Sequence, residues 1–91
     1  LTDIYVIPMG TEIECLKIAQ ILRKAGYKTE VEMKHGKIRK ALDYANIENI
    51  PYVFILGEDE LKEKNITVRN MQTKEQVQIS IDNIVEEFSK L

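Results

Sequence analysis

The sequence contains one cysteine, one histidine and no tryptophan in 91 residues. A single cysteine, Cys15, excludes an intramolecular disulfide and argues against a cysteine-based metal cluster, which fits a reducing compartment such as the cytoplasm. The longest apolar run is far shorter than the roughly 20 residues that span a bilayer. No segment has the charged, apolar and small-residue layout of a secretory signal. We therefore expect a cytoplasmic protein that does not bind membranes.

An excess of positive charge is also missing, because 13 Lys and Arg stand against 15 Asp and Glu and the formal net charge is −2. This balance argues against a protein that grips nucleic acid by bulk charge. A local basic segment is nevertheless present at 34–40, "KHGKIRK", whereas acidic residues concentrate at 58–60 and 86–87. The length and the ordinary composition predict one globular domain over residues 1–91. The chain starts at Leu1 rather than Met, so we expect this domain to be excised from a longer chain.

Catalytic patterns are missing as well. The sequence has neither GxGxxG nor a P-loop, and no serine lies in a nucleophile elbow. His35 stands alone at an expected strand–helix junction, and Cys15 is expected to pack as a small hydrophobic residue. Glu58, Asp59 and Glu60 follow one another on one turn and point in different directions, which argues against a metal site. We expect no catalytic residue, metal ion or cofactor in this chain.

The hydrophobic pattern predicts strands and helices in a definite order. Strands are expected at 3–9, 27–33, 52–56, 66–70 and 76–79, and helices at 12–25, 36–47 and 80–91. Thr11 and Glu14 have capping-box spacing at the first helix. Its expected buried positions are Ile13, Leu16, Ala19 and Leu22, flanked by Ile18, Ile21 and Ala25.

The order β-α-β-α-β-β-β-α determines the expected fold. Two βα alternations require parallel strands with right-handed crossovers. About nine residues without a helix join the third and fourth strands, so this pair must be antiparallel. We therefore expect an α/β fold, a three-layer α/β/α sandwich around a mixed five-stranded sheet. In such sheets the crevice beyond the carboxyl ends of the strands is the usual binding place, and the turns at 8–11, 35–37 and 57–60 all follow strands.

The segment 51–79, "PYVFILGEDELKEKNITVRNMQTKEQVQI", resembles the C-terminal anticodon-binding domain of class II aminoacyl-tRNA synthetases, most closely that of histidyl-tRNA synthetase. The segments 19–32 and 37–46 resemble the same family. Two family glycines are replaced here by Lys64 and Lys74. Asn65 tolerates a left-handed conformation, so we expect the first of these turns to shift by one residue. These departures keep the prolyl-, threonyl- and glycyl-tRNA synthetases open as relatives.

The resemblance implies tRNA anticodon recognition as part of a histidine–tRNA ligase. Glu60 and Arg69 match family positions that contact unstacked anticodon bases, and the tRNA-binding set implied here is completed by Glu58, Lys34, His35 and Lys37. ATP would be used only in a separate catalytic domain, through which the parent enzyme would form a homodimer. Two rivals remain: a free-standing paralogue that binds a protein or another RNA, and an unrelated flavodoxin-like or receiver-like module. A receiver domain should have a carboxylate at the end of its first strand, which is absent at 8–10.

Overall fold

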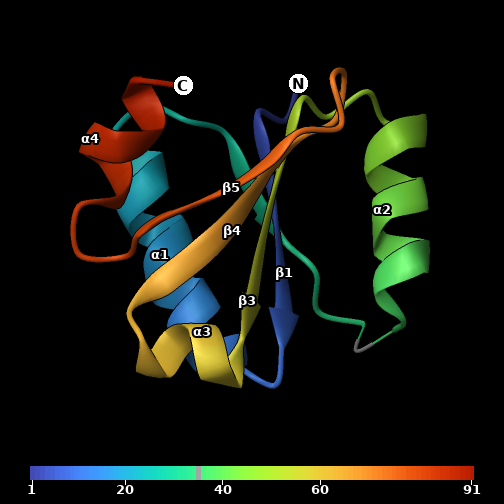
Figure 1. Cartoon of the computed structure of the whole chain (residues 1–91). Helices are drawn as coiled ribbons and strands as arrows, with labels where there is room; N and C mark the ends of the chain where they lie inside the picture. Colours follow the sequence, from blue (N-terminus) through green and yellow to red (C-terminus); the bar gives the residue numbers. More distant parts are fainter. Residues whose placement is uncertain (35) are drawn as a thin grey trace.

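A computed structural model describes residues 1–34 and 36–91 of the chain. The five strands are β1 (Ile4–Met9), β2 (Thr29–Val31), β3 (Tyr52–Gly57), β4 (Asn65–Asn70) and β5 (Gln76–Ser80). The four helices are α1 (Glu12–Lys24), α2 (Ile38–Ile47), α3 (Glu58–Lys62) and α4 (Ile84–Ser89). One sheet contains all five strands, with α1 and α4 on one side and α2 on the other (Figure 1). The predicted three-layer α/β/α sandwich is confirmed.

The sheet is mixed, in the order β2-β1-β3-β4-β5. β1 pairs in parallel with both β2 and β3, which follow it through the crossover helices α1 and α2. β4 returns antiparallel to β3, with Ile55 opposite Thr67, and β5 is antiparallel to β4. The predicted antiparallel step between the third and fourth strands is therefore correct, and the apolar strand at 52–56 occupies the centre of the sheet.

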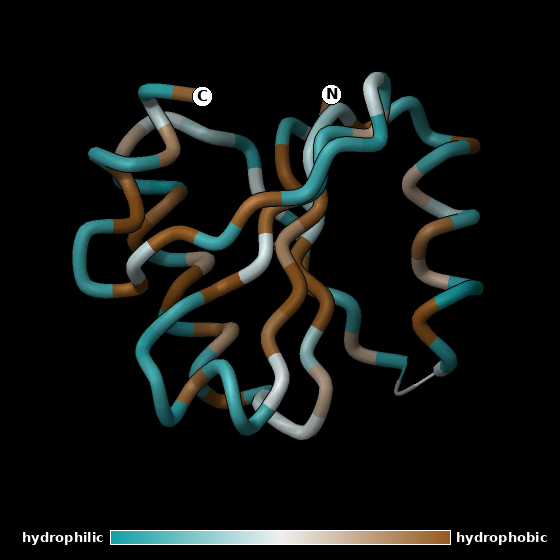
Figure 2. The backbone as a smooth tube through the Cα atoms, viewed as in Figure 1, coloured by the Kyte–Doolittle hydropathy of each residue, from teal (hydrophilic) through white to brown (hydrophobic). Residues whose placement is uncertain are grey.

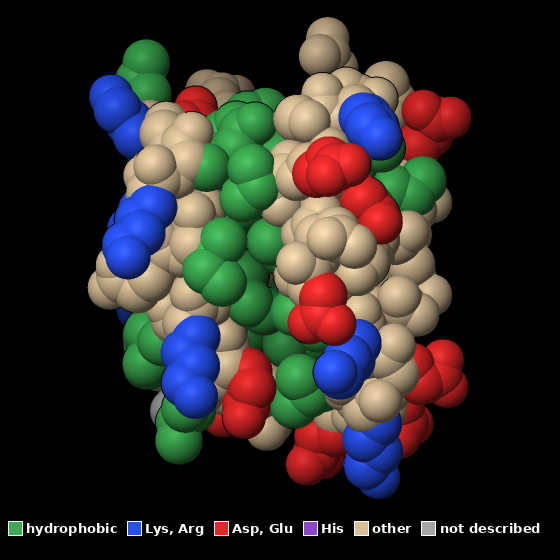
Figure 3. All heavy atoms as spheres, turned by 90° about the vertical axis from the view of Figure 1, so that its left-hand side faces the viewer, with side chains coloured by type: hydrophobic (Ala, Val, Ile, Leu, Met, Phe, Trp, Pro, Cys, Tyr) green, Lys and Arg blue, Asp and Glu red, His purple; other side chains and the backbone are tan. Residues whose placement is uncertain are grey.

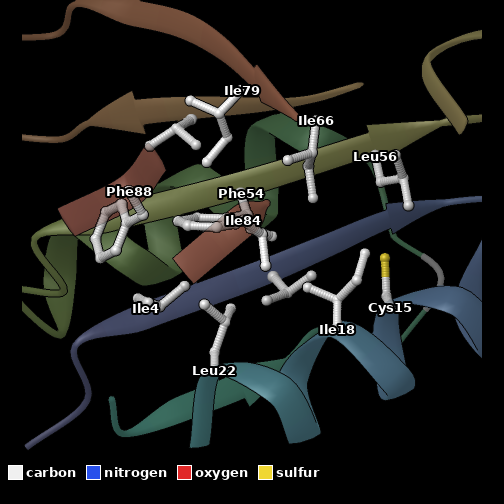
Figure 4. Close-up of a cluster of buried hydrophobic side chains, with 12 residues drawn as sticks. Ile4, Cys15, Ile18, Leu22, Phe54, Leu56, Ile66, Ile79, Ile84 and Phe88 are labelled. Atoms are coloured by element: carbon white, nitrogen blue, oxygen red, sulfur yellow. The ribbon is translucent and has the colours of Figure 1, made fainter. Parts of the chain in front are cut away.

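Two hydrophobic clusters fill the layers on either side of the sheet. The larger lies between the sheet and α1 with α4, and Figure 4 shows Leu22, Phe54 and Phe88 among its side chains. The smaller packs Ala41 and Ala45 of α2 against β1 and β3. Figure 2 shows the hydrophobic residues concentrated along the central strands. Alternate residues of a strand face opposite sides, so β3 contributes Phe54 to one cluster and Val53 to the other.

The buried side of α1 agrees with the prediction at Ile18, Ala19 and Leu22, and Cys15 packs as expected, but Ile13 and Leu16 do not. Its buried residues are Cys15, Ile18, Ala19 and Leu22, whereas Ile13 is 66% exposed and Leu16 is 42% exposed. Both sets have helical spacing, and packing against the sheet selects the first. On the side of the molecule covered by α1 and α4, exposed hydrophobic side chains form a band with Lys and Arg side chains along one flank (Figure 3).

The start of α1 also differs from the prediction, because Thr11 makes no capping hydrogen bond to the helix backbone. Its hydroxyl instead donates a 2.8 Å hydrogen bond to the backbone carbonyl of Leu56, and it lies 3.5 Å from the Cys15 sulfur. Thr11 is 1% exposed. The predicted capping box with Glu14 is therefore wrong, and the hydroxyl serves a tertiary contact between the first turn of α1 and the end of β3.

The connection from β3 to β4 contains the helix α3, which the sequence did not predict. Three acidic residues in its first turn favour a helix, since negative charge is stabilising near a helix N-terminus. β2 is shorter than expected and leaves Met33 exposed, and α2 begins at Ile38 rather than 36.

Two lysines occupy backbone conformations that favour glycine. Lys64 has φ 58° and Lys74 has φ 67°, both in the left-handed region. These are the two positions at which the resembling family has glycine. The turn before β4 has not shifted, because Lys64 carries the positive φ and Asn65 already belongs to the strand. Both lysines therefore adopt a conformation in which a side chain is strained.

Candidate functional site

One side of the β4–β5 hairpin has polar residues, whereas its other side packs hydrophobic residues into the core. Ile66 and Val68 face the cluster beneath α1 and α4, so Thr67 and Arg69 between and beyond them face the α2 side. The strand register places Gln78 opposite Thr67 and Gln76 opposite Arg69. Together with the side chain that reaches Thr67 from α3, these residues form the polar face, which comprises Glu60, Thr67, Arg69, Gln76 and Gln78.

Glu60 is held in place by hydrogen bonds from three elements. Its Oε1 accepts a 3.0 Å bond from the Gly57 backbone N–H, which closes the first turn of α3. Its Oε2 accepts from the Thr67 hydroxyl and, at 3.2 Å, from Gln78 Nε2. A carboxylate offers about four acceptor positions, so one remains for a donor from outside. Glu60 also lines a hollow of about 210 Å³ together with Gln78.

Arg69 lies farther along the same side of β4. Its Nη1 donates a 2.9 Å hydrogen bond to Gln76 Oε1 across the hairpin. Its Nε is buried and has no hydrogen-bond partner among the described residues. A buried donor without a partner costs about 1–3 kcal/mol. The structure thus keeps a guanidinium at a position where its burial is not fully compensated by the protein.

The polar face therefore brings together an acceptor and a donor of opposite charge. Thr67, which contacts Glu60, is two residues from Arg69, a separation of about 7 Å along a strand. An ionised carboxylate only accepts hydrogen bonds, whereas a guanidinium only donates them. Such a pair suits a flat polar ligand edge that presents both donors and acceptors, as the edge of a nucleobase does.

The remaining predicted residues lie away from this face. Glu58 begins α3 and is exposed, and its carboxyl carbon would lie 3.5 Å from a Cβ added to Gly10. Lys34 follows β2, the edge strand opposite β5, and Lys37 directly precedes α2. Both lysines are exposed. His35 lies outside the described residues.

A hollow of about 480 Å³ lies beside Lys34 between β2 and α2. Two of its polar side chains bond within the protein: Tyr44 donates a 3.0 Å hydrogen bond to Glu30, which also accepts from Thr2. The Tyr5 and Tyr44 rings lie 4.9 Å apart. Burial raises the pKa of Tyr5 above its usual range, and the bond to Glu30 raises that of Tyr44. These contacts attach α2 to β2.

The fold determines the surroundings of the metal-ligating residue types and of the single cysteine, which is buried. Within residues 1–34 and 36–91 no group of three His, Cys, Asp or Glu side chains could hold a metal ion. Burial raises the pKa of the Cys15 thiol to about 11, so this thiol is protonated at neutral pH. No helix in this described part of the chain is both long and apolar enough to cross a membrane.

Three members of the polar face were not identified as candidate site residues from the sequence: Thr67, Gln76 and Gln78. The alternation within 65–70 places Thr67 beside Arg69 on one side of its strand, so that signal was available. The glutamines depend on the pairing register of β5 with β4, which the turn at 71–75 determines.

Known proteins with similar sequences show to which family this chain belongs. The family model described as "Anticodon binding domain" matches residues 3–91. A histidine–tRNA ligase 1 from Bacillus cereus is 47% identical over 83 residues, which is 90% of this chain and 20% of that protein. A histidine–tRNA ligase from Pyrococcus furiosus is 43% identical over 86 residues, 92% of this chain and 20% of that protein.

A solved structure shows the same arrangement. The crystal structure of histidyl-tRNA synthetase from Nostoc sp. PCC 7120 aligns with a TM-score of 0.89 and 25% identity, and covers 98% of this chain and 22% of that one. The chain belongs to the anticodon-binding domain family. Both of the relatives named above are histidine–tRNA ligases, which agrees with the resemblance predicted from the sequence. It spans about a fifth of the length of the curated relatives it matches.

Proposed function

We propose that this domain binds the anticodon loop of a tRNA through the polar face, as the C-terminal domain of a histidine–tRNA ligase. The observation that carries the proposal is the placement of Glu60 and Arg69 on one side of the β4–β5 hairpin. Bases of a single-stranded loop expose their hydrogen-bonding edges, which a carboxylate and a guanidinium can contact together. Glu60 accepts from a base N–H, and Arg69 donates to a base oxygen or nitrogen.

The basic residues between β2 and α2 extend the proposed surface beyond the polar face. Lys34 and Lys37 are exposed and can contact phosphates of the loop, which positions RNA without selecting sequence. His35 and Glu58 belong to the proposed set through the family resemblance. This domain requires no cofactor. In the parent enzyme, which is homodimeric and cytoplasmic, ATP and histidine are used in a separate catalytic domain.

A titration with an RNA hairpin that carries the anticodon GUG tests this function. The hairpin with a scrambled loop serves as the RNA control, and both are measured by fluorescence anisotropy at low and moderate salt. We expect the GUG loop to bind more tightly. Equal affinity for both loops, or no binding at low salt, would overturn the proposal and favour an interaction module with another partner.

The variant Glu60→Gln tests the residue. Its amide oxygen can still accept from Gly57, so α3 is retained while the negative charge and one acceptor group are lost. We expect the preference for GUG to fall about tenfold, since base contacts contribute about 1–3 kcal/mol. Glu86→Gln is the matched control, because it removes the same charge from exposed α4 on the other side of the sheet.

A further inference from the structure

The polar face holds charges of both signs without an ion pair between them. Lys64–Asp82 and Lys90–Glu86 form ion pairs, each with N···O of 3.7 Å. Neither involves Glu60 or Arg69, although both side chains lie on one side of the same hairpin. A carboxylate and a flexible guanidinium at such spacing would attract each other in the absence of ligand. Each of the two charged groups is instead hydrogen-bonded to uncharged side chains of the polar face.

Each charged group has a neutral amide partner on β5. Gln76 presents its oxygen to Arg69 at 2.9 Å, and Gln78 presents its nitrogen to Glu60 at 3.2 Å. A glutamine side chain contains both an acceptor and a donor, so the same residue type can match either charge. The register of β4 with β5 places Gln76 directly opposite Arg69 and Gln78 directly opposite Thr67, which itself contacts Glu60. The two amides therefore extend across the hairpin as a matched pair.

We propose that Gln76 and Gln78 are positioning residues, which orient Arg69 and Glu60 and keep them separate for a base edge that carries both hydrogen-bond donors and acceptors. This inference rests on the proposed function. A neutral partner fixes the direction of a charged group but leaves its charge uncompensated. A charged partner would instead form a charge-assisted pair with the guanidinium and occupy its donors. The base edge then meets two charged groups that are already oriented, which lowers the ordering cost of binding.

The substitution Gln76→Glu tests the inference with nearly no change of shape. The new carboxylate accepts the same hydrogen bond but pairs electrostatically with Arg69. Any added negative charge also repels RNA, so the quantity to measure is the ratio of the dissociation constants for the scrambled and GUG loops. Gln72→Glu is the matched control, since it adds the same charge to an exposed position in the turn of the same hairpin.

We expect Gln76→Glu to lower this ratio about tenfold or more, because a well-oriented Arg–base contact contributes about 1–3 kcal/mol. Gln72→Glu should weaken the binding of both RNA loops by the same factor and leave the ratio of their dissociation constants unchanged. The Arg69 Nε–H resonance in a nitrogen–proton NMR spectrum should shift in Gln76→Glu and not in Gln72→Glu. These changes should occur without a lower thermal midpoint, which separates positioning from folding.

Three results overturn the inference in different ways. If the wild-type domain prefers GUG and Gln76→Glu retains that ratio, the glutamine does not position Arg69, and the proposed function stands. If the wild-type domain shows no preference, the proposed function fails and the inference fails with it. A lowered ratio in Gln72→Glu as large as that in Gln76→Glu also overturns it, because added charge alone would then explain the effect.

Discussion

The hydroxyl of Thr11 donates a 2.8 Å hydrogen bond to the carbonyl of Leu56, so the first turn of α1 is joined to the end of β3. Both residues are buried. We expect Thr11→Val to cost about 1–3 kcal/mol in the free energy of unfolding, since the carbonyl loses its buried donor at nearly constant shape. Thr11→Ser keeps the hydroxyl and should cost less. Urea unfolding measures both, and a more stable valine variant would contradict this role.

The left-handed lysines lead to a prediction of gained stability. A non-glycine residue in the left-handed region destabilises the folded state by roughly 1–2 kcal/mol, and glycine relieves this strain. Glycine also stabilises the unfolded chain through its greater conformational entropy, which offsets roughly 0.4–1 kcal/mol of the relief. Lys74→Gly should therefore stabilise the domain by up to about 1 kcal/mol. The control Lys62→Gly, within α3, should destabilise it by about 1 kcal/mol. If both variants lose stability in urea unfolding, strain at position 74 is ruled out.

Arg69 should stabilise binding at the expense of folding. Because its buried Nε has no partner within the described residues, Arg69→Met removes an uncompensated donor and keeps an apolar stem. We expect the free energy of unfolding to stay equal or rise by about 1 kcal/mol, while discrimination between GUG and scrambled loops is lost. Chemical unfolding and anisotropy titration on one preparation test both parts. A loss of more than about 1 kcal/mol would assign Arg69 a structural role instead.

The lysines between β2 and α2 should affect affinity differently from the polar face. In the proposed complex Lys37 contacts a phosphate, so Lys37→Ala should weaken the binding of every RNA loop by a similar factor, whatever its sequence. The slope of log affinity against log salt should decrease by about 0.7, the value for one contact with a single strand. Titrations across a salt series provide this slope. A change confined to the GUG loop would indicate a base contact for Lys37.

Cys15 should be unreactive in the folded domain. Burial raises the pKa of its thiol to about 11, so we expect iodoacetamide to label it slowly at neutral pH and rapidly in urea. The unfolded chain loses this proton at lower pH than the folded chain. The thiol's contribution to stability is therefore complete below about pH 9 and is lost as pH rises toward 11. Cys15→Ala should remove this part of the alkaline decline, and fast labelling of the native domain would contradict the burial.

The strand pairings were predictable because they follow from chain connectivity. Two βα alternations require parallel partners, and a short connection requires an antiparallel one. The buried side of α1 was not predictable in this way. Ile13 and Leu16 have helical spacing, but so do Cys15, Ile18 and Leu22, and only contact with the sheet decides between them. Periodicity alone therefore identified the helix but not its orientation.

The candidate site divides along similar lines. Glu60 and Arg69 were proposed through resemblance, and the structure places both on one side of a hairpin. α3 was missed because Glu58 and its acidic neighbours resembled a solvated turn, although acidic residues also favour the first turn of a helix. The glutamines were missed because their position depends on strand register, which a sequence pattern does not specify by itself.

The whole polar face belongs to one uninterrupted stretch of chain, from α3 to β5, that pairs with the rest of the sheet through β3. The parallel core of β1, β2 and β3 is assembled from segments outside this stretch. The same stretch also contributes Ile66, Val68 and Ile79 to the larger hydrophobic cluster, so the proposed recognition residues are contiguous in sequence and supported by the opposite side of their own strands. Under the proposed function, we expect that exchange of this segment alone between related domains transfers the base preference. The parallel strands and their crossover helices would be the same in both domains.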